Sequence, residues 1–233
     1  MPIRHAFISP KIDTGDATLL QPSHWAADHI VTGSGMAPAQ LVGTSVNSTS
    51  LVLTFGSSPS STSMLFMGTS QLAATGTISS VVQTNVTWTK LHTNSQGTSI
   101  TVELWRGVPT GAPGTTITLS WTGTLNTYAA AGEWLTGHGL AGTVDKFANA
   151  GGAAATSQMT GFIKPSSAGA LTFAIYGCVN GTIPLRAPLG PFNAMSASVF
   201  ALSAYCWGGA HGLMSGVALQ TSSIWANAIV SII

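Results

Sequence analysis

Short runs in which apolar and polar residues alternate recur along most of the chain. Residues 98–107 place Ile100, Val102 and Leu104 on one phase, and residues 115–123 repeat the same period. A period of two among β-branched and aromatic residues is typical of half-buried β-strands. These segments are therefore predicted to be strands with one face turned toward a core.

Further strand candidates follow at a spacing of roughly ten residues, and turns rich in Gly, Pro and Ser separate them. They are residues 50–55, 64–67, 77–83, 85–93, 126–137, 169–179, 196–207, 212–220 and 223–233. Residues 169–179 form a nearly continuous apolar run, which predicts a central strand buried on both faces. Residues 142–158, rich in Ala and Gly, predict a short strand followed by a long loop. With no long helical pattern and no repeat of fixed period, the chain is predicted to be an all-β antiparallel β-sandwich, jelly-roll-like.

The beginning of the chain has a different composition. Three of the six acidic residues (Asp13, Asp16 and Asp28) precede a Gly/Pro-punctuated segment at 32–40. Such a segment is typical of a linker or loop. We therefore predict two parts: an extended N-terminal attachment arm at 1–36 and a β-sandwich domain at 37–233.

Charge is scarce in the 233-residue chain. Charged residues make up 6% and the formal net charge is +1, against about 25% charged residues in typical globular domains. Without a cluster of Lys and Arg, binding to nucleic-acid phosphates is not expected. No secretory signal pattern and no apolar run of about 18 residues is present, so synthesis in the host cytoplasm and no membrane insertion are expected. So little charge gives weak repulsion between copies and favours a life inside an assembly.

Groups able to carry catalysis are few. Beyond residue 36 the carboxylates are Glu103, Glu133 and Asp145, and no nucleophile turn or histidine metal motif occurs. We therefore expect no enzyme activity, no cofactor and no metal site. Cys178 and Cys206 are either two buried thiols or a cross-strand disulfide.

Seven tryptophans are the most prominent large side chains. At regular strand positions Trp fills a core or a subunit interface, whereas a row of exposed Trp would form a platform for sugars. The sequence leaves both alternatives open.

Residues 5–31 resemble a short segment found at the start of many structural proteins of tailed phages. The matching positions are Lys11, Asp13, Asp16, Thr18, Leu19, Pro22, Ser23, Trp25, Ala27 and His29. Ala26 departs from the pattern, which usually has Asn there. The resemblance implies that Pro22, Trp25 and His29 contact another virion protein, with Trp25 as the anchor.

A second resemblance covers residues 88–135. The strand end Glu103-Leu104-Trp105 and the later pair Glu133-Trp134 are similar to a β-sandwich module of phage and bacterial surface proteins. This likeness implies a fold and no activity.

Together these features predict a virion structural protein, either a capsid decoration protein or a tail or fibre component. The alternative is a carbohydrate-binding receptor-recognition module of a phage tail, whose partner would be a host surface glycan. A homo-oligomer is expected, and the class implies a trimer. The apolar C-terminus predicts burial of four side chains, as a final core strand or against symmetry mates: Ile229, Val230, Ile232 and Ile233.

Overall fold

The computed structural model describes residues 41–72, 76–134, 142–167, 170–180, 193–197, 201–207 and 217–233. The chain divides into one unit at 1–34 and a second at 35–233, and the second unit is called the body. The first unit lies outside the described residues, so the predicted arm stays a prediction.

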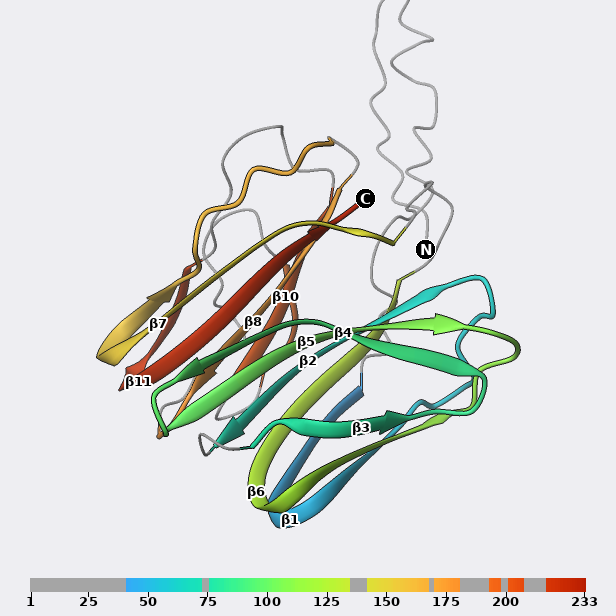
Figure 1. Ribbon diagram of the computed structural model, residues 1–233, viewed down its shortest axis with the longest axis horizontal. Coiled ribbons are helices and arrows are strands. Elements are labelled where there is room, and N and C mark those ends of the chain that lie inside the picture. Colours follow the sequence, from blue (N-terminus) through green and yellow to red (C-terminus); the bar gives the residue numbers. More distant parts are fainter. Residues whose placement is uncertain are drawn as a thin grey trace, which may run out of the picture. The chain divides into compact units, whose positions relative to one another are not determined.

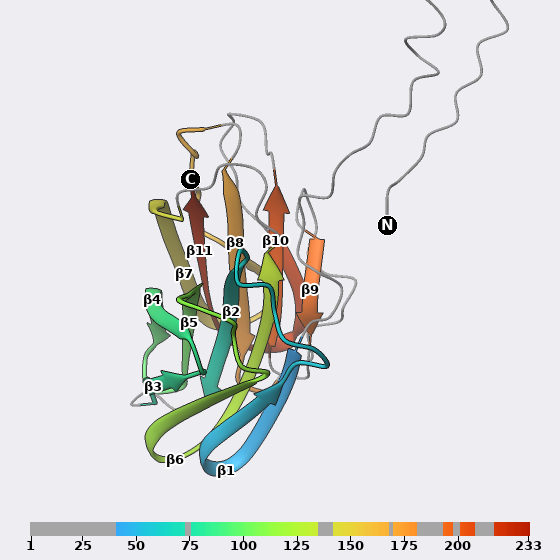
Figure 2. The same ribbon diagram turned by 90° about the vertical axis from the view of Figure 1, so that its right-hand side faces the viewer.

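Eleven β-strands and no helix make up the described part of the body, and the strands form two antiparallel sheets (Figure 1). The first sheet contains β1 (Leu41–Thr54), β2 (Met64–Leu72), β3 (Ile78–Val82), β4 (Val86–Gln96), β5 (Ile100–Pro109) and β6 (Thr116–Trp134). The second sheet contains β7 (Val144–Met159), β8 (Leu171–Cys178), β9 (Asn193–Ala197), β10 (Ala201–Trp207) and β11 (Val217–Ile232). Their strand orders are β1-β6-β2-β5-β4, with β3 paired to β6, and β7-β11-β8-β10-β9 (Figure 2).

The two sheets pack face to face around a main core. The alternation predicted for β5 places Ile100, Val102 and Leu104 in this core. They meet Phe173 and Ile175 of β8, the middle strand of the second sheet. All eight residues of β8 are buried, as predicted for a central strand. The prediction of an antiparallel β-sandwich is confirmed.

The first sheet also folds back over its own outer face. A Cβ atom on Gly43 would lie 3.1 Å from Cδ1 of Leu51, eight residues later in the same strand. A straight strand would separate these residues by about 26 Å, so β1 must bend sharply. The bend falls where the β1–β6 register shifts, between Ser45 and Ser50. It closes a second core that includes Leu51, Leu119 and Trp121.

The second sheet bends in the same way. A Cβ atom on Gly161 would lie 2.7 Å from Cβ of Ala148, although Met159 would be about 36 Å beyond Ala148 in a straight strand. Two residues span at most about 7 Å, so β7 must turn back before it ends. The register of β7 with β11 shifts midway along the pair. In each half of the body, the long outer strand pair therefore folds back on its own sheet.

The two halves share one topology. Replacing β1, β6, β2, β5 and β4 by β7, β11, β8, β10 and β9 converts one strand order into the other. Contacts between the sheets follow the same exchange: β5 touches β8 and β11, while β10 touches β2 and β6. Likewise β4 touches β11 and β9 touches β6. The body is thus two similar sheets related by an approximate two-fold axis.

The axis runs along the strands between β2 and β8. Phe66 and Phe173, the third residues of these strands, have ring centroids 5.8 Å apart. The seventh residues also meet, because a Cβ on Gly177 would lie 2.7 Å from Oγ of Ser70. Since residues face their own equivalents along both strands, the axis must be parallel to them. The sequence predicts no repeat, whereas the structure reveals one in the path of the backbone.

Several predicted elements change in the structure. The predicted strands at 115–123 and 126–137 are one bent strand, β6, and 196–207 is the hairpin of β9 and β10. The loop predicted within residues 142–158 belongs to β7, because pairing with β11 continues to Met159. The strand order does not support the jelly-roll part of the prediction: each sheet is built from consecutive strands, whereas jelly-roll strands alternate between sheets.

Candidate functional site

Glu103 lies at the centre of a polar cluster on the first sheet. Lys90 Nζ donates to its Oε1 at 2.5 Å and Thr93 Oγ1 to the same oxygen at 3.2 Å, while Trp105 Nε1 donates to Oε2 at 3.0 Å. The Lys90 ammonium also lies 5.0 Å from the centroid of a Trp105 ring. Glu103 has an exposure of 0%, against 32% for the Lys90 side chain.

Strand pairing explains this cluster. β4 and β5 are antiparallel neighbours, and the bulge between Lys90 and His92 brings Lys90 and Thr93 beside Glu103. Both carboxylate oxygens are occupied by donors from the same sheet. The arrangement neutralises a buried charge, fastens β4 to β5 and keeps both carboxylate oxygens away from solvent.

Glu103 and Glu133 do not form a pair with the spacing of glycoside hydrolases. On β2, Glu103 pairs with Thr69 and Glu133 with Leu65. Four residues correspond to about 13 Å along the strand, and two strand spacings to about 10 Å across it. The two carboxyl groups of a glycosidase lie within about 9.5 Å of each other.

The other two described carboxylates anchor equivalent loops. Glu133 Oε1 accepts the amide of Ser60 at 2.7 Å, and Asp145 Oδ2 accepts the amide of Ser166 at 2.8 Å. Each serine follows a buried proline in a Pro-Ser-Ser segment, at 59–61 before β2 and at 165–167 before β8. The two Pro-Ser-Ser segments therefore occupy equivalent places in the two halves of the body.

Asp145 is held by more than one donor. Besides the amide, Ser166 Oγ donates to Oδ1 at 2.6 Å and Ser231 Oγ to Oδ2 at 3.1 Å. Burial raises the pKa of Asp145, but the bonds from Ser166 and Ser231 and the nearby Lys146 outweigh burial and lower its pKa below the ordinary value. Asp145 therefore serves as an ionised anchor.

Burial also shifts the pKa of two ring side chains. It lowers the pKa of His92, whose ring lies 4.6 Å from that of Phe147, and it raises the pKa of Tyr176. The Tyr176 hydroxyl and Nδ2 of Asn227, its register partner, are buried and have no hydrogen-bond partner among the residues that the structure describes. The His92 ring and the Tyr176 hydroxyl are therefore neutral near pH 7, and among the described residues neither lies beside a nucleophile–base pair.

The described tryptophans form no exposed platform. Trp105, Trp121 and Trp134 are buried. Trp88 and Trp225 are half-buried, and each packs on a glycine, Gly107 and Gly152 respectively. Trp25 and Trp207 cannot be placed, because Trp25 and the side chain of Trp207 lie outside the described residues. Of the two alternatives drawn from the sequence, packing in the core describes Trp105, Trp121 and Trp134, and Trp88 packs against the second core.

The cysteines are too far apart for a disulfide. Cys206 pairs with Thr172, which precedes Cys178 by six residues on β8. That separation is about 20 Å, whereas bonded cysteines have Cα atoms within about 7 Å. Of the two alternatives, a cross-strand disulfide is excluded by the register.

The C-terminal residues belong to the main body. Ile229, Val230 and Ile232 have 0% exposure and Ile233 is half-buried, because β11 lies between β7 and β8. The sequence predicts two ways of burying this apolar end, and the structure shows the first of them: β11 is the final strand of the core. A role of the four residues in an oligomer interface stays a prediction.

The proposed attachment residues Pro22, Trp25 and His29 lie outside the described residues, as do His138 and His211. Among the residues that are described, no group of His, Cys, Asp or Glu is arranged to hold a metal ion. The same residues include no helix long and apolar enough to cross a membrane.

The folded-back part of the first sheet presents a surface that the sequence analysis missed. β1, β6 and β3 lie side by side, and their outward residues form uncharged rows. The rows are Ser50–Ser120–Ser80 and Val52–Thr118–Val82. The sequence feature that could have predicted this surface is the polar phase of residues 115–123, which carries only Ser and Thr. Such a surface offers hydrogen bonds and shape to a partner, without charge.

Comparison of the chain with protein-family models, with curated proteins and with solved structures returns no match.

Proposed function

We propose that this protein is a structural component of a tailed-phage particle, a capsid decoration protein or a tail or fibre component, that acts by assembly and binding. The observation that carries the proposal is the segment at residues 5–31, which resembles the start of many phage structural proteins around Pro22, Trp25 and His29. The protein would be made in the host cytoplasm and would reside in the virion.

The body supports this proposal through what its polar groups do. Glu103, Glu133 and Asp145 each hold neighbouring strands or loops in place. The outward rows of β1, β6 and β3 carry Ser, Thr and Val only. A sandwich of this kind suits a building block that presents neutral surfaces to other subunits. Its partners would be further copies of itself and other capsid or tail proteins; nucleic acid and membrane lipids are not proposed.

Carbohydrate recognition is the weaker candidate. A sugar platform needs aromatic faces open to solvent, and the five tryptophans that can be placed are buried or half-buried. A glycan-array screen with the purified protein would separate the two classes, because binding to a defined glycan would favour the receptor-recognition module.

Removal of the arm tests the proposed attachment. A chain lacking residues 1–36 should keep a β-rich circular-dichroism spectrum and cooperative unfolding, yet should not join particles. In the full chain, Trp25→Ala should reduce incorporation strongly, since a buried Trp dominates an interface. Thr14→Ala, at a position outside the matched pattern, is the control and should incorporate normally. Normal occupancy of the truncated chain would refute the role of the arm.

A further inference from the structure

Within the described part of the body, β1 is a sheet edge that no element covers on its outer side. Its strand neighbour is β6 alone. The equivalent edge strand, β7, is covered by β4 of the opposite sheet: Asn94 Nδ2 donates to the carbonyl of Ala150 at 2.8 Å, and His92 lies against Phe147. If the two halves were identical, the approximate two-fold axis would turn the contact between β4 and β7 into an equivalent contact between β9 and β1. Within the described part of the chain, no contact of that extent joins them.

Backbone groups of β1 point out of this edge. Phe55 N donates to the carbonyl of Thr115 at 2.7 Å. Because hydrogen-bonded pairs alternate along antiparallel strands, Leu51 and Leu53 bond β6, while Val52 and Thr54 turn their N–H and C=O groups to the open side. At the next such residue, Ser50, the Ser48 hydroxyl bonds both the N–H and the C=O.

The side chains of this edge are complementary to themselves. Residues 50–54 read Ser-Leu-Val-Leu-Thr, which is nearly palindromic about Val52. Leu51 and Leu53 are buried in the second core, and Val52 is 54% exposed. Edge strands are commonly protected by Lys, Pro, an inward charge or a β-bulge. The register of β1 shifts only before Ser50, and residues 50–54 contain none of these features.

We infer that residues 50–54 of β1 pair antiparallel with the same residues of a second copy of this chain, about a two-fold axis at Val52. Val52 would face Val52 of the partner subunit. Ser50 would face Thr54 of the partner subunit, where ladder bonds form once the Ser48 hydroxyl gives up its bonds to the N–H and C=O of Ser50. The partner is a second copy because the edge matches itself in sequence and carries no charge to repel its like. This inference rests on the proposed function, since it names a surface through which copies of an assembly protein associate. A contact of this symmetry closes at two subunits, in place of the trimer implied by the class.

Light scattering coupled to gel filtration of the full chain tests the contact. The wild type should elute with twice the 23.7 kDa mass of one chain at tens of micromolar. Val52→Lys should be monomeric, because a charge at the dyad would face its own copy. Thr54→Pro should be monomeric as well, since it removes an outward N–H at an edge position that tolerates proline.

Val82→Lys is the matched control. Val82 of β3 is 62% exposed and lies in the same outward row as Val52, with Thr118 of β6 between them. It should leave the dimer intact. A monomeric Val82→Lys would show that the face makes the contact and would overturn edge pairing, as would a dimeric Val52→Lys or a monomeric wild type. A monomer that dimerises only after deletion of residues 1–36 would mean that the arm covers the edge, and would also overturn the inference. A monomeric wild type that still enters particles would overturn the inference and leave the proposed function standing. A dimer that is absent from particles would support the inference and contradict the proposed function.

Discussion

At the residue scale, the ion pair between the buried Glu103 and the partly exposed Lys90 joins β5 to β4. The alternation of residues 98–107 correctly separates Val102 and Leu104 from Glu103. It does not reveal that Glu103 is fully buried, because the outer face of the first sheet is closed by a fold-back of β1 and β6. The partner of Glu103 comes from β4, where a bulge resets the phase after Lys90. A pattern of hydropathy contains no information on such a register shift.

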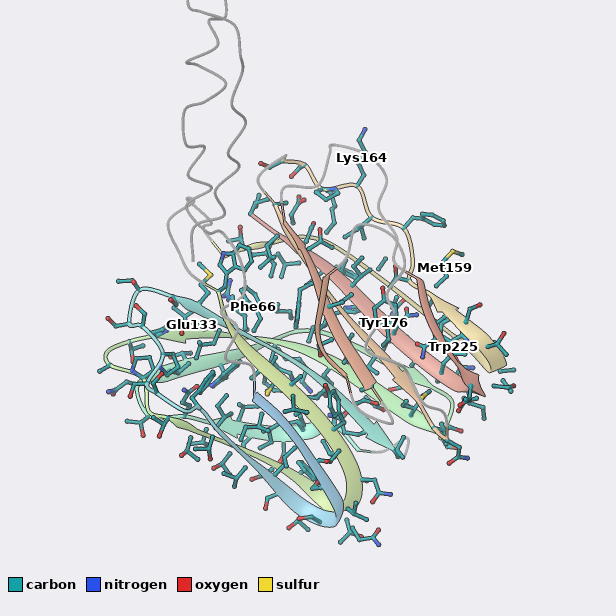
Figure 3. All side chains as sticks on the ribbon, turned by 180° about the vertical axis from the view of Figure 1, so that it is seen from behind. Phe66, Glu133, Met159, Lys164, Tyr176 and Trp225 are labelled. Atoms are coloured by element: carbon teal, nitrogen blue, oxygen red, sulfur yellow. The ribbon has the colours of Figure 1, made fainter. Side chains whose placement is uncertain are left out.

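Lys90 should contribute more to the free energy of unfolding than an exposed lysine does. Lys90→Met leaves the carboxylate of Glu103 buried without its cation, so the free energy of unfolding in urea should fall by on the order of 2 kcal/mol. The loss is below that of a fully buried pair, because 32% of the Lys90 side chain is exposed. Lys164, which points away from the body (Figure 3), gives the control: Lys164→Met should change stability by less than about 0.5 kcal/mol. Equal effects of the two substitutions would refute a stabilising role for the ion pair.

At the element scale, strand existence is predictable and strand continuation is not. Period-two runs mark most of the strands, and the continuous apolar run marks β8. Residues 148–155 look like a loop, because Ala and Gly are poor strand formers. In the structure their small size suits the crowding around β7, where a Cβ on Gly152 would lie 3.1 Å from the Trp225 ring. The repeat cannot be seen in the sequence, because the two halves share the path of the backbone and differ in the side chains that each half packs.

Close approach of β2 and β8 at the two-fold axis should make Gly177 intolerant of a side chain. A Cβ there would lie 2.7 Å from Oγ of Ser70, 2.7 Å from Cγ1 of Val102 and 2.9 Å from Cδ1 of Ile100. Gly177→Ala should therefore lower the free energy of unfolding by about 1–3 kcal/mol. Val102→Ala in the same chain should recover part of this loss, measured as a coupling in a double-mutant cycle. Gly56, with no atom within 4 Å of its Cβ position, is the control. Additive effects of the two core substitutions would contradict this close packing.

At the scale of the whole molecule, the low charge and the shape of the body point the same way. The described carboxylates are engaged internally, and the outward rows of β1, β6 and β3 offer an uncharged surface with which to meet other subunits. The class of fold could be predicted from period and turn spacing alone. The open edge of β1 could not, because it depends on which strand covers which edge in three dimensions. The attachment role of the arm rests on the resemblance of residues 5–31, independently of the body.

The most direct test of the central claim is the protein composition of purified phage particles from the strain that encodes this chain. Particles banded on a density gradient would be analysed by quantitative mass spectrometry. A virion structural protein should be present as the 23.7 kDa chain in multiple copies per particle, at a constant ratio to the major capsid or tail protein across gradient fractions. If peptides of this chain remain in the unassembled lysate while the particles contain none, it is not a component of the virion.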